Sequence, residues 1–327
     1  MMRRIYLIIP LAIFLGLLFT SFRFSPETFN KPAKAKQIKT IIVDAGHGHG
    51  RHGGDGPDGA HGSYSYEDDI TLGVAKKLIA ELKLQLPDVR VLETRPTNNY
   101  VSLKDRANFA NQNNGDLFIS IHVNSAPKLR EVKIIGHHKE TYYVYSGKGK
   151  KKKKTRKTHT VPTYKTYYYP NPANGTETYV FASHKTDDKT EFITENGDNF
   201  MNEQDDSTMI SDFKSPELLA QAALWTKKFF FNSIKLATQV EDEFNVGGRI
   251  SRGVKQRRVG IWVLQATAMP SILVETGYIS HRPEEDYLNS EKGQQDIAES
   301  VAKAVKWYKE QQESPAKNND TQSNGNR

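Results

Sequence analysis

Short apolar runs alternate with amphipathic stretches over the first part of the chain, and this alternation restricts the fold more than any other feature. Apolar residues recur every four positions at Val74, Leu78 and Leu82, which predicts a helix over residues 68–85. The remaining segments of the alternation are strands at residues 40–43, 89–93 and 117–121 and a helix at residues 102–112. The pattern predicts an α/β fold with a mostly parallel or mixed central sheet flanked by helices.

Further along the chain the same kinds of element return after an interruption. Ser215 and Pro216 suit the N-cap and first position of a long helix. The other expected elements are strands at residues 175–181, 259–264 and 271–275 and a helix at residues 294–311. We therefore expect one domain over residues 39–312, with a polar, disordered tail over residues 313–327.

The N-terminus is typical of a segment that enters or crosses a membrane. Arg3 and Arg4 precede eighteen uncharged residues, 5–22. Such a segment suits a signal peptide, and its length reaches the lower limit for a membrane-spanning helix. Residues 1–22 therefore predict either a cleaved signal or an inner-membrane anchor, followed by a linker over residues 23–38. Both alternatives place the rest of the chain in the periplasm or cell envelope.

The positive charge of the chain is concentrated in one segment. The net charge is +8, yet residues 128–174 alone carry +11, so the rest of the chain carries −3. Because this segment shows little sustained periodicity, we interpret it as an insertion. Its basic run over residues 148–157 predicts attraction to acidic envelope polymers or lipid. A solvated loop without a function is the main alternative, and nucleic acid is not the partner that we expect.

Residues suited to metal chemistry begin in a loop directly after the first strand. His47, His49, His52 and His61 lie within fifteen residues of one another, among many glycines. The chain has no cysteine, so any metal must use His, Asp or Glu. Neutral imidazole is a common zinc ligand, and α/β proteins place their sites at the C-terminal edge of the sheet. The loop favours a zinc site, with a solvated turn as the alternative.

Three other residues stand where expected strands end or helices begin. His122 follows the strand at residues 117–121, where it could be a metal ligand. The alternative is a structural histidine in the core. Glu67 stands at the entrance to the first helix, where a carboxylate also stabilises the helix dipole. Glu275 ends an entirely apolar strand. Since burial raises the pKa of a carboxyl group, Glu275 has the properties of a general base.

Taken together, these segments resemble the zinc-dependent N-acetylmuramoyl-L-alanine amidases, in particular the exported cell-separation amidases. The resemblance extends from about residue 39 to residue 309, apart from the insertion. The matching segments are residues 42–48, 59–62, 67, 94–95, 103–108, 116–124, 175–180, 252–255, 263–264 and 269–280.

The resemblance implies a Zn²⁺ ion held by His47, Glu67 and His122, with Glu275 as the catalytic carboxylate. It also implies hydrolysis of the amide between N-acetylmuramic acid and L-alanine in peptidoglycan, for wall remodelling or daughter-cell separation. Three protein ligands would leave a fourth position for water, as in catalytic zinc sites. The alternatives are a zinc peptidase that cuts stem peptides and an inactive wall-binding scaffold.

Some features depart from the pattern of this family. Twenty residues separate His47 from Glu67, slightly more than is usual, so His49 or His52 competes with His47 as a ligand. His281 occupies a position at which this family commonly has Asn. The acidic stretch at residues 186–212 occupies the interval where some relatives carry a blocking segment, and we expect residues 191–212 either to cap the metal until an activator protein removes them or to form a solvated loop.

Overall fold

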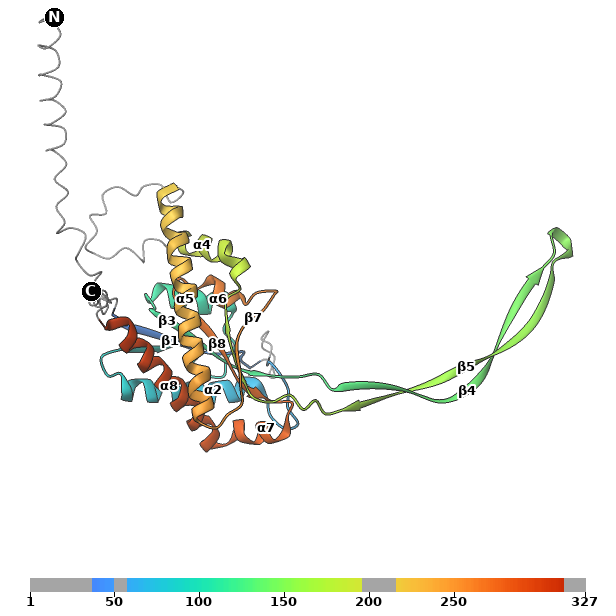
Figure 1. Ribbon diagram of the computed structural model, residues 1–327, viewed down its shortest axis with the longest axis horizontal. Coiled ribbons are helices and arrows are strands. Elements are labelled where there is room, and N and C mark those ends of the chain that lie inside the picture. Colours follow the sequence, from blue (N-terminus) through green and yellow to red (C-terminus); the bar gives the residue numbers. More distant parts are fainter. Residues whose placement is uncertain (1–36, 50–57, 196–215, 315–327) are drawn as a thin grey trace, which may run out of the picture. The chain divides into compact units, whose positions relative to one another are not determined.

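Six strands form the central sheet, in the order β2-β1-β3-β8-β6-β7. The computed structural model describes residues 37–49, 58–195 and 216–314 (Figure 1). Neighbouring strands are parallel, except that β6 is antiparallel to β8. The strands are β1 (Thr40–Ala45), β2 (Arg90–Glu93), β3 (Leu117–Asn124), β6 (Thr176–Val180), β7 (Ser251–Gln256) and β8 (Ser271–Tyr278). This mixed sheet confirms the expected fold class.

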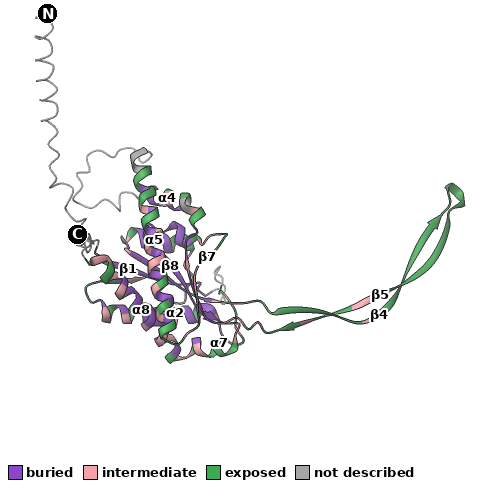
Figure 2. Ribbon diagram, viewed as in Figure 1, coloured by how far each residue is buried: buried purple, intermediate pink, exposed green. Residues whose placement is uncertain are grey.

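Helices cover both faces of the sheet (Figure 2), so every residue of β1 and β8 is buried. Ile41 and Val43 of β1 pack into the larger core, which includes residues of α2 (Glu67–Gln85), α5 (Pro216–Val246) and α8 (Glu291–Glu313). Ile42, between them, faces the opposite way and packs with α3 (Leu103–Gln112) and α6 (Trp262–Ala266). Because successive side chains of a strand point to opposite faces of the sheet, β1 contributes to both hydrophobic cores.

Two further helices follow the interior strands β6 and β8. The helix α4 (Thr186–Glu195) comes after the short 3₁₀ turn η4 (Ser183–Lys185) and contributes Ile193 to a small core that also contains Ala222 and Phe229 of α5. The helix α7 (Arg282–Asn289) follows β8 and precedes α8. The first part of the expected acidic stretch is therefore a packed helix, and residues 196–212 lie outside the described residues.

Residues expected to form an irregular insertion instead form a long β-hairpin. Strand β4 (Leu129–Ser146) pairs antiparallel with β5 (Lys153–Tyr169), and the 3₁₀ turn η3 (Gly149–Lys151) lies at the closed end. The two strands form a separate sheet, and nearly all of their residues are exposed. Because neither face packs on a core, the sequence has no reason to alternate apolar and polar residues, and this explains why the strands were missed.

Most expected elements are confirmed, but the prediction of a strand at residues 259–264 was wrong. Gly260 has φ 79° and Val259 is 81% exposed, so neither continues a buried strand. The segment turns into α6, and its residues Val263 and Leu264 fill the second core. The edge strand of the sheet is β7 instead. It could not be recognised from the sequence, because its residues are mostly polar and only half-buried and so show no apolar pattern.

Segments at both ends of the chain are only partly described. The expected signal or anchor over residues 1–22, and almost all of the linker and of the tail, lie outside the described residues. In the described part of the chain, no helix combines the length and the apolar character that crossing a membrane requires.

Candidate metal centre

The three expected zinc ligands converge from three different elements. His47 follows β1, Glu67 is the first residue of α2, and His122 lies on β3. One ligand atom from each lies within 4.8 Å of the others. Oε1 of Glu67 is 3.2 Å from Nε2 of His47 and 3.0 Å from Nδ1 of His122. Two imidazoles and one carboxylate are a donor set found at catalytic zinc sites with an open fourth position.

The carboxylate of Glu67 is fixed in place by the backbone as well as by the histidines. Oε1 accepts a hydrogen bond from the backbone N–H of Val123 at 2.9 Å, and Oε2 accepts one from Ala60 at 2.7 Å. Burial alone would raise the pKa of Glu67, but the hydrogen bonds from His122 and His47 hold it well below its usual range. Glu67 is therefore anionic, as a metal ligand must be.

Close packing around the candidate ligands explains two glycines of this loop. A Cβ atom at Gly59 would lie 2.6 Å from Oε2 of Glu67, and one at Gly46 would lie 2.4 Å from the ring of His122. Any larger residue at either position would displace a candidate ligand. His47 itself has φ 61°, in the left-handed region that a non-glycine residue rarely adopts.

Two buried arginines hold the backbone of this loop. Arg106 donates to Oδ1 of Asp44 at 2.7 Å and also to the carbonyl of His47. Arg95 donates to the carbonyls of Gly46 at 3.0 Å and Asp68 at 2.9 Å. Burial would raise the pKa of Asp44, but the charge of Arg106 and the hydrogen bonds from Thr94, Ser120 and Arg106 together outweigh it and lower that pKa. The ligand loop thus rests on a buried ion pair.

Glu275 lies on β8 directly beside His122 in the register of β3 and β8. Its side chain is buried, and its Oε2 has no hydrogen-bond partner among the residues that the structure describes. Burial, reinforced by the charges of Glu67 and Glu177, raises the pKa of Glu275 to about 8. A carboxyl group with this pKa can both accept and donate a proton near neutral pH.

One functional neighbour of Glu275 was not expected from the sequence. Glu177 of β6 pairs with Glu275 across the antiparallel strands. Its carboxylate accepts hydrogen bonds from Arg252 at 2.7 Å, Lys255 at 3.0 Å and the hydroxyl of Tyr278 at 2.9 Å. Burial opposes ionisation, yet these donors lower the pKa of Glu177 to about 2. Its place beside Glu275 follows only from the pairing of β6 with β8, which a linear sequence does not reveal.

The other histidines that the structure describes take no part in this cluster. His49 lies 3.1 Å from Oδ2 of Asp68 and forms a second group with Asp68 and Asp69. His52 lies outside the described residues. His281 is the N-cap residue of α7. As expected, the remaining histidines are exposed, namely His61, His137, His138, His159 and His184.

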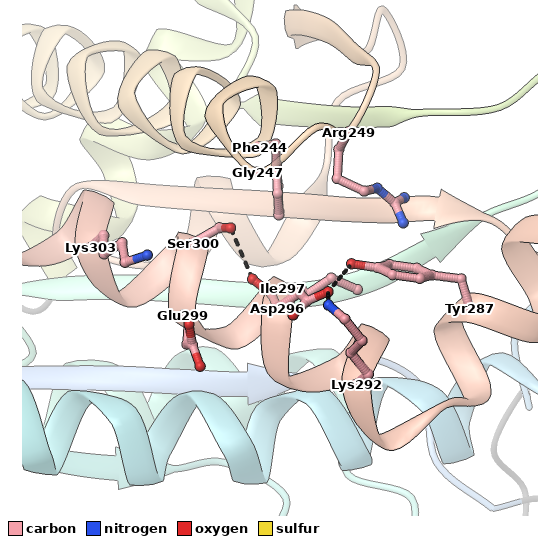
Figure 3. A pocket seen from close by; sticks show the side chains of 10 residues that line it. All are labelled: Phe244, Gly247, Arg249, Tyr287, Lys292, Asp296, Ile297, Glu299, Ser300 and Lys303. Atoms are coloured by element: carbon pink, nitrogen blue, oxygen red, sulfur yellow. Dashed lines mark hydrogen bonds and ion pairs between the residues drawn. The ribbon is translucent and has the colours of Figure 1, made fainter.

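A separate cavity of about 170 Å³ lies where α5, α7 and α8 meet (Figure 3). Charged side chains dominate its lining, including Arg249, Lys292 and Asp296. None of the candidate ligands and neither Glu275 nor Glu177 borders it. The cavity therefore does not belong to the candidate metal centre.

An α/β fold that brings such a candidate donor set beside a buried carboxyl group is typical of metal-dependent hydrolases. The model of the Amidase_3 family, N-acetylmuramoyl-L-alanine amidase, matches residues 41–307. The chain belongs to this family.

Known relatives agree with this assignment. The amidase AmiC of Escherichia coli O6:H1 is 25% identical over 282 residues, which are 85% of this chain and 55% of AmiC, so the chain spans about half the length of that relative. The uncharacterized protein YqiI of Bacillus subtilis is 24% identical over 84% of this chain and 86% of its own length. The solved structure of an N-acetylmuramoyl-L-alanine amidase from Clostridium difficile 630 matches with a TM-score of 0.51 and 23% identity, over 84% of this chain and 97% of that one.

Proposed function

We propose that the chain is a zinc-dependent amidase that hydrolyses the bond between N-acetylmuramic acid and L-alanine in peptidoglycan. The observation that carries this proposal is the convergence of His47, Glu67 and His122 within 4.8 Å, beside the buried Glu275. Membership of the Amidase_3 family and the amidase names of its relatives support the choice of substrate.

The candidate ligands suit Zn²⁺ because two neutral imidazoles and one carboxylate form an uncrowded set with room for a fourth ligand. Zinc bound there would supply Lewis acidity, which polarises a carbonyl group and lowers the pKa of a water molecule to about 7. Glu67 contributes the negative charge of the set, and it is already ionised before any metal arrives. The rings of His47 and His122 lie edge to face, with their centroids 4.8 Å apart.

Glu275 performs the proton transfers in this mechanism. As a carboxylate, it accepts a proton from the water whose oxygen attacks the amide carbon. As a carboxylic acid, it then donates that proton to the nitrogen of L-alanine when the C–N bond breaks. The products are a muramic-acid carboxylate on the glycan and a free stem peptide. A pKa of about 8 suits a group that must act in both directions.

We further propose that the protein acts outside the cytoplasm, in the periplasm or cell envelope, where it remodels the wall or separates daughter cells. The basic and apolar sequence of residues 1–22 supports export or anchoring. Among the relatives are a sporulation-specific amidase of Bacillus subtilis and a cell wall amidase of Bacillus anthracis.

Regulation by a partner protein is part of this proposal. We infer that a carboxylate of residues 191–212, which begin in the last turns of α4, caps the metal centre. An activator protein would then remove it. The CwlD amidase of Clostridioides difficile, whose solved structure is in complex with the GerS lipoprotein, provides a precedent for a protein partner.

Digestion of purified peptidoglycan tests the proposed reaction. The full chain, Glu275→Gln and His122→Ala are compared with and without a chelator, and zinc content is measured on the same samples. We expect mass spectrometry to detect intact stem peptides with a free L-alanine terminus, and chelation to stop their release. Glu275→Gln should be inactive while it retains zinc, whereas His122→Ala should lose both.

Two outcomes would contradict the proposal. Release of shortened stem peptides would indicate a peptidase instead. If the chain binds zinc yet remains inert, deletion of residues 191–211 separates the alternatives, because an autoinhibited enzyme gains activity and a scaffold does not.

A further inference from the structure

The closed end of the β4–β5 hairpin carries a dense positive charge that the amidase reaction does not need. Eight of the ten residues from 148 to 157 are Lys or Arg, and no Asp or Glu occurs between Glu140 and Glu177. All ten residues are exposed. Since no carboxylate of the hairpin end neutralises these cations, they are available to an anionic partner.

The cations lie on both faces of the hairpin. Residues that pair directly across two antiparallel strands share one face, and consecutive residues alternate. Tyr143 pairs with Arg156 and Tyr145 with Lys154, which places two cations on one face. Tyr142 pairs with Lys157 and Ser146 with Lys153, which places two on the other. A planar surface laid against the hairpin would contact only one of these sets.

Exposed tyrosines lie among the same cations. Tyr142, Tyr143 and Tyr145 are 42%, 50% and 62% exposed. The ammonium of Lys154 lies 3.9 Å from the ring centroid of Tyr143. Such cation–π contacts hold lysine side chains in position on the strands. The strand pairing therefore presents the charges on a regular scaffold, in contrast to a flexible lysine tail.

We propose that the end of the hairpin, residues 142–157, binds a linear phosphodiester polymer of the cell envelope. A flexible polyanion can follow the cations around both faces, as a flat bilayer cannot. The choice of an envelope polymer over nucleic acid rests on the proposed function outside the cytoplasm. Binding there would hold the enzyme close to the wall without using any residue of the metal centre.

Binding of labelled poly(glycerol phosphate) to the full chain tests this inference. The test variant replaces Lys150, Lys151, Lys152 and Lys153 with Gln. The matched control replaces four exposed lysines of α2 and α5 with Gln, namely Lys76, Lys83, Lys227 and Lys228. Both variants lose four positive charges, so only the position of the loss differs. Affinity is measured from 50 to 300 mM salt, beside single-stranded DNA and phosphatidylglycerol vesicles at equal phosphate concentration.

We expect the hairpin variant to bind poly(glycerol phosphate) at least about tenfold more weakly, with a salt dependence that is lower by about three ion equivalents. The control variant should bind like the unchanged chain. Equal losses in both variants, or no loss in either, would overturn the inference. Tighter hairpin-dependent binding to vesicles or to DNA would also overturn it and indicate a bilayer or nucleic acid instead.

The amidase reaction is followed separately on a soluble muropeptide. We expect the hairpin variant to cleave it at the rate of the unchanged chain. The proposed function and the proposed binding can thus fail independently of each other.

Discussion

At the scale of single residues, Glu177 joins several charged and polar side chains beside Glu275 into one network. Its buried carboxylate accepts hydrogen bonds from Arg252, Lys255 and two tyrosine hydroxyls, those of Tyr179 and Tyr278. We expect Glu177→Gln to lower the free energy of unfolding by about 2 kcal/mol, because two cations lose their counter-charge in a partly buried site. Chemical denaturation measures this loss.

The control for this substitution is an exposed ion pair of the same kind. Asp286 pairs with Arg282, and both side chains are more than half exposed. Asp286→Asn should change stability by no more than about 0.5 kcal/mol. If Glu177→Gln unfolds at the same denaturant concentration as Asp286→Asn, the network around Glu177 does not stabilise the fold.

The raised pKa of Glu275 predicts a pH dependence of stability in the metal-free protein. The folded state keeps a proton up to about pH 8, whereas the unfolded state releases it near the ordinary value of 4.5. This contribution to stability is complete below pH 4.5 and is lost as the pH rises toward 8. Glutamine does not ionise, so the Glu275→Gln variant does not lose this contribution. The free energy of unfolding of the variant, relative to that of the unchanged chain, should therefore rise with pH by up to about 5 kcal/mol.

Denaturation curves at pH 5, 6, 7 and 8 in the presence of a chelator measure this difference. Asp286→Asn should keep the pH slope of the unchanged chain. Parallel curves for Glu275→Gln and the unchanged chain would show that Glu275 is ionised in the folded state across this range.

At the scale of elements, the ammonium group of Lys189 attaches α4 to the rest of the domain. Its Nζ donates to the carbonyls of Leu264 at 2.7 Å and Thr267 at 2.6 Å, and the side chain is fully buried. Burial lowers the pKa of Lys189 to about 7. Lys189→Met would leave both carbonyls without this donor, and we expect α4 to open more easily by about 2 kcal/mol.

Hydrogen exchange along α4 measures this opening, since protection reports local unfolding. Lys227→Met, on the exposed side of α5, serves as the control and should leave exchange in α4 unchanged. Equal protection in both variants would mean that the packing of Ile193, and not Lys189, holds α4 in place.

The elements differ in how far the sequence alone could predict them. β1, β3 and β8 were predictable because strands buried on both faces require continuous apolar runs, and α2 was predictable from its period of four. The edge strand β7 and the exposed hairpin lack such constraints on their composition. His47, Glu67, His122 and Glu275 stand at the ends or beginnings of buried elements, where polar residues attract notice. Glu177 does not, because its role arises from strand pairing.

At the scale of the whole molecule, a bound metal would connect three elements that are distant in the sequence. Zinc at 100 times its dissociation constant adds about 2.7 kcal/mol to stability, which raises the melting temperature by about 5 °C or more in a domain of this size. His47→Ala and His122→Ala should abolish this increase. His49→Ala should keep it, because His49 faces Asp68 and not Glu67. Loss of the increase in His49→Ala would instead make His49 the ligand.

The hairpin and the six-stranded sheet are separate sheets, so we expect the domain to fold without the hairpin. Leu129 and Tyr169 are directly paired, and a two-residue Asn-Gly turn can therefore replace residues 130–168. The deletion changes the net charge from +8 to −2, because it removes twelve Lys or Arg and two Glu. Thermal unfolding should shift by less than about 3 °C, since few buried contacts are lost. Binding to a cation-exchange resin should weaken strongly. The contradicting outcome is a shortened chain that fails to fold while the variant with four lysines replaced folds normally. The strands of the hairpin would then stabilise the domain, in addition to any role of the hairpin's charge.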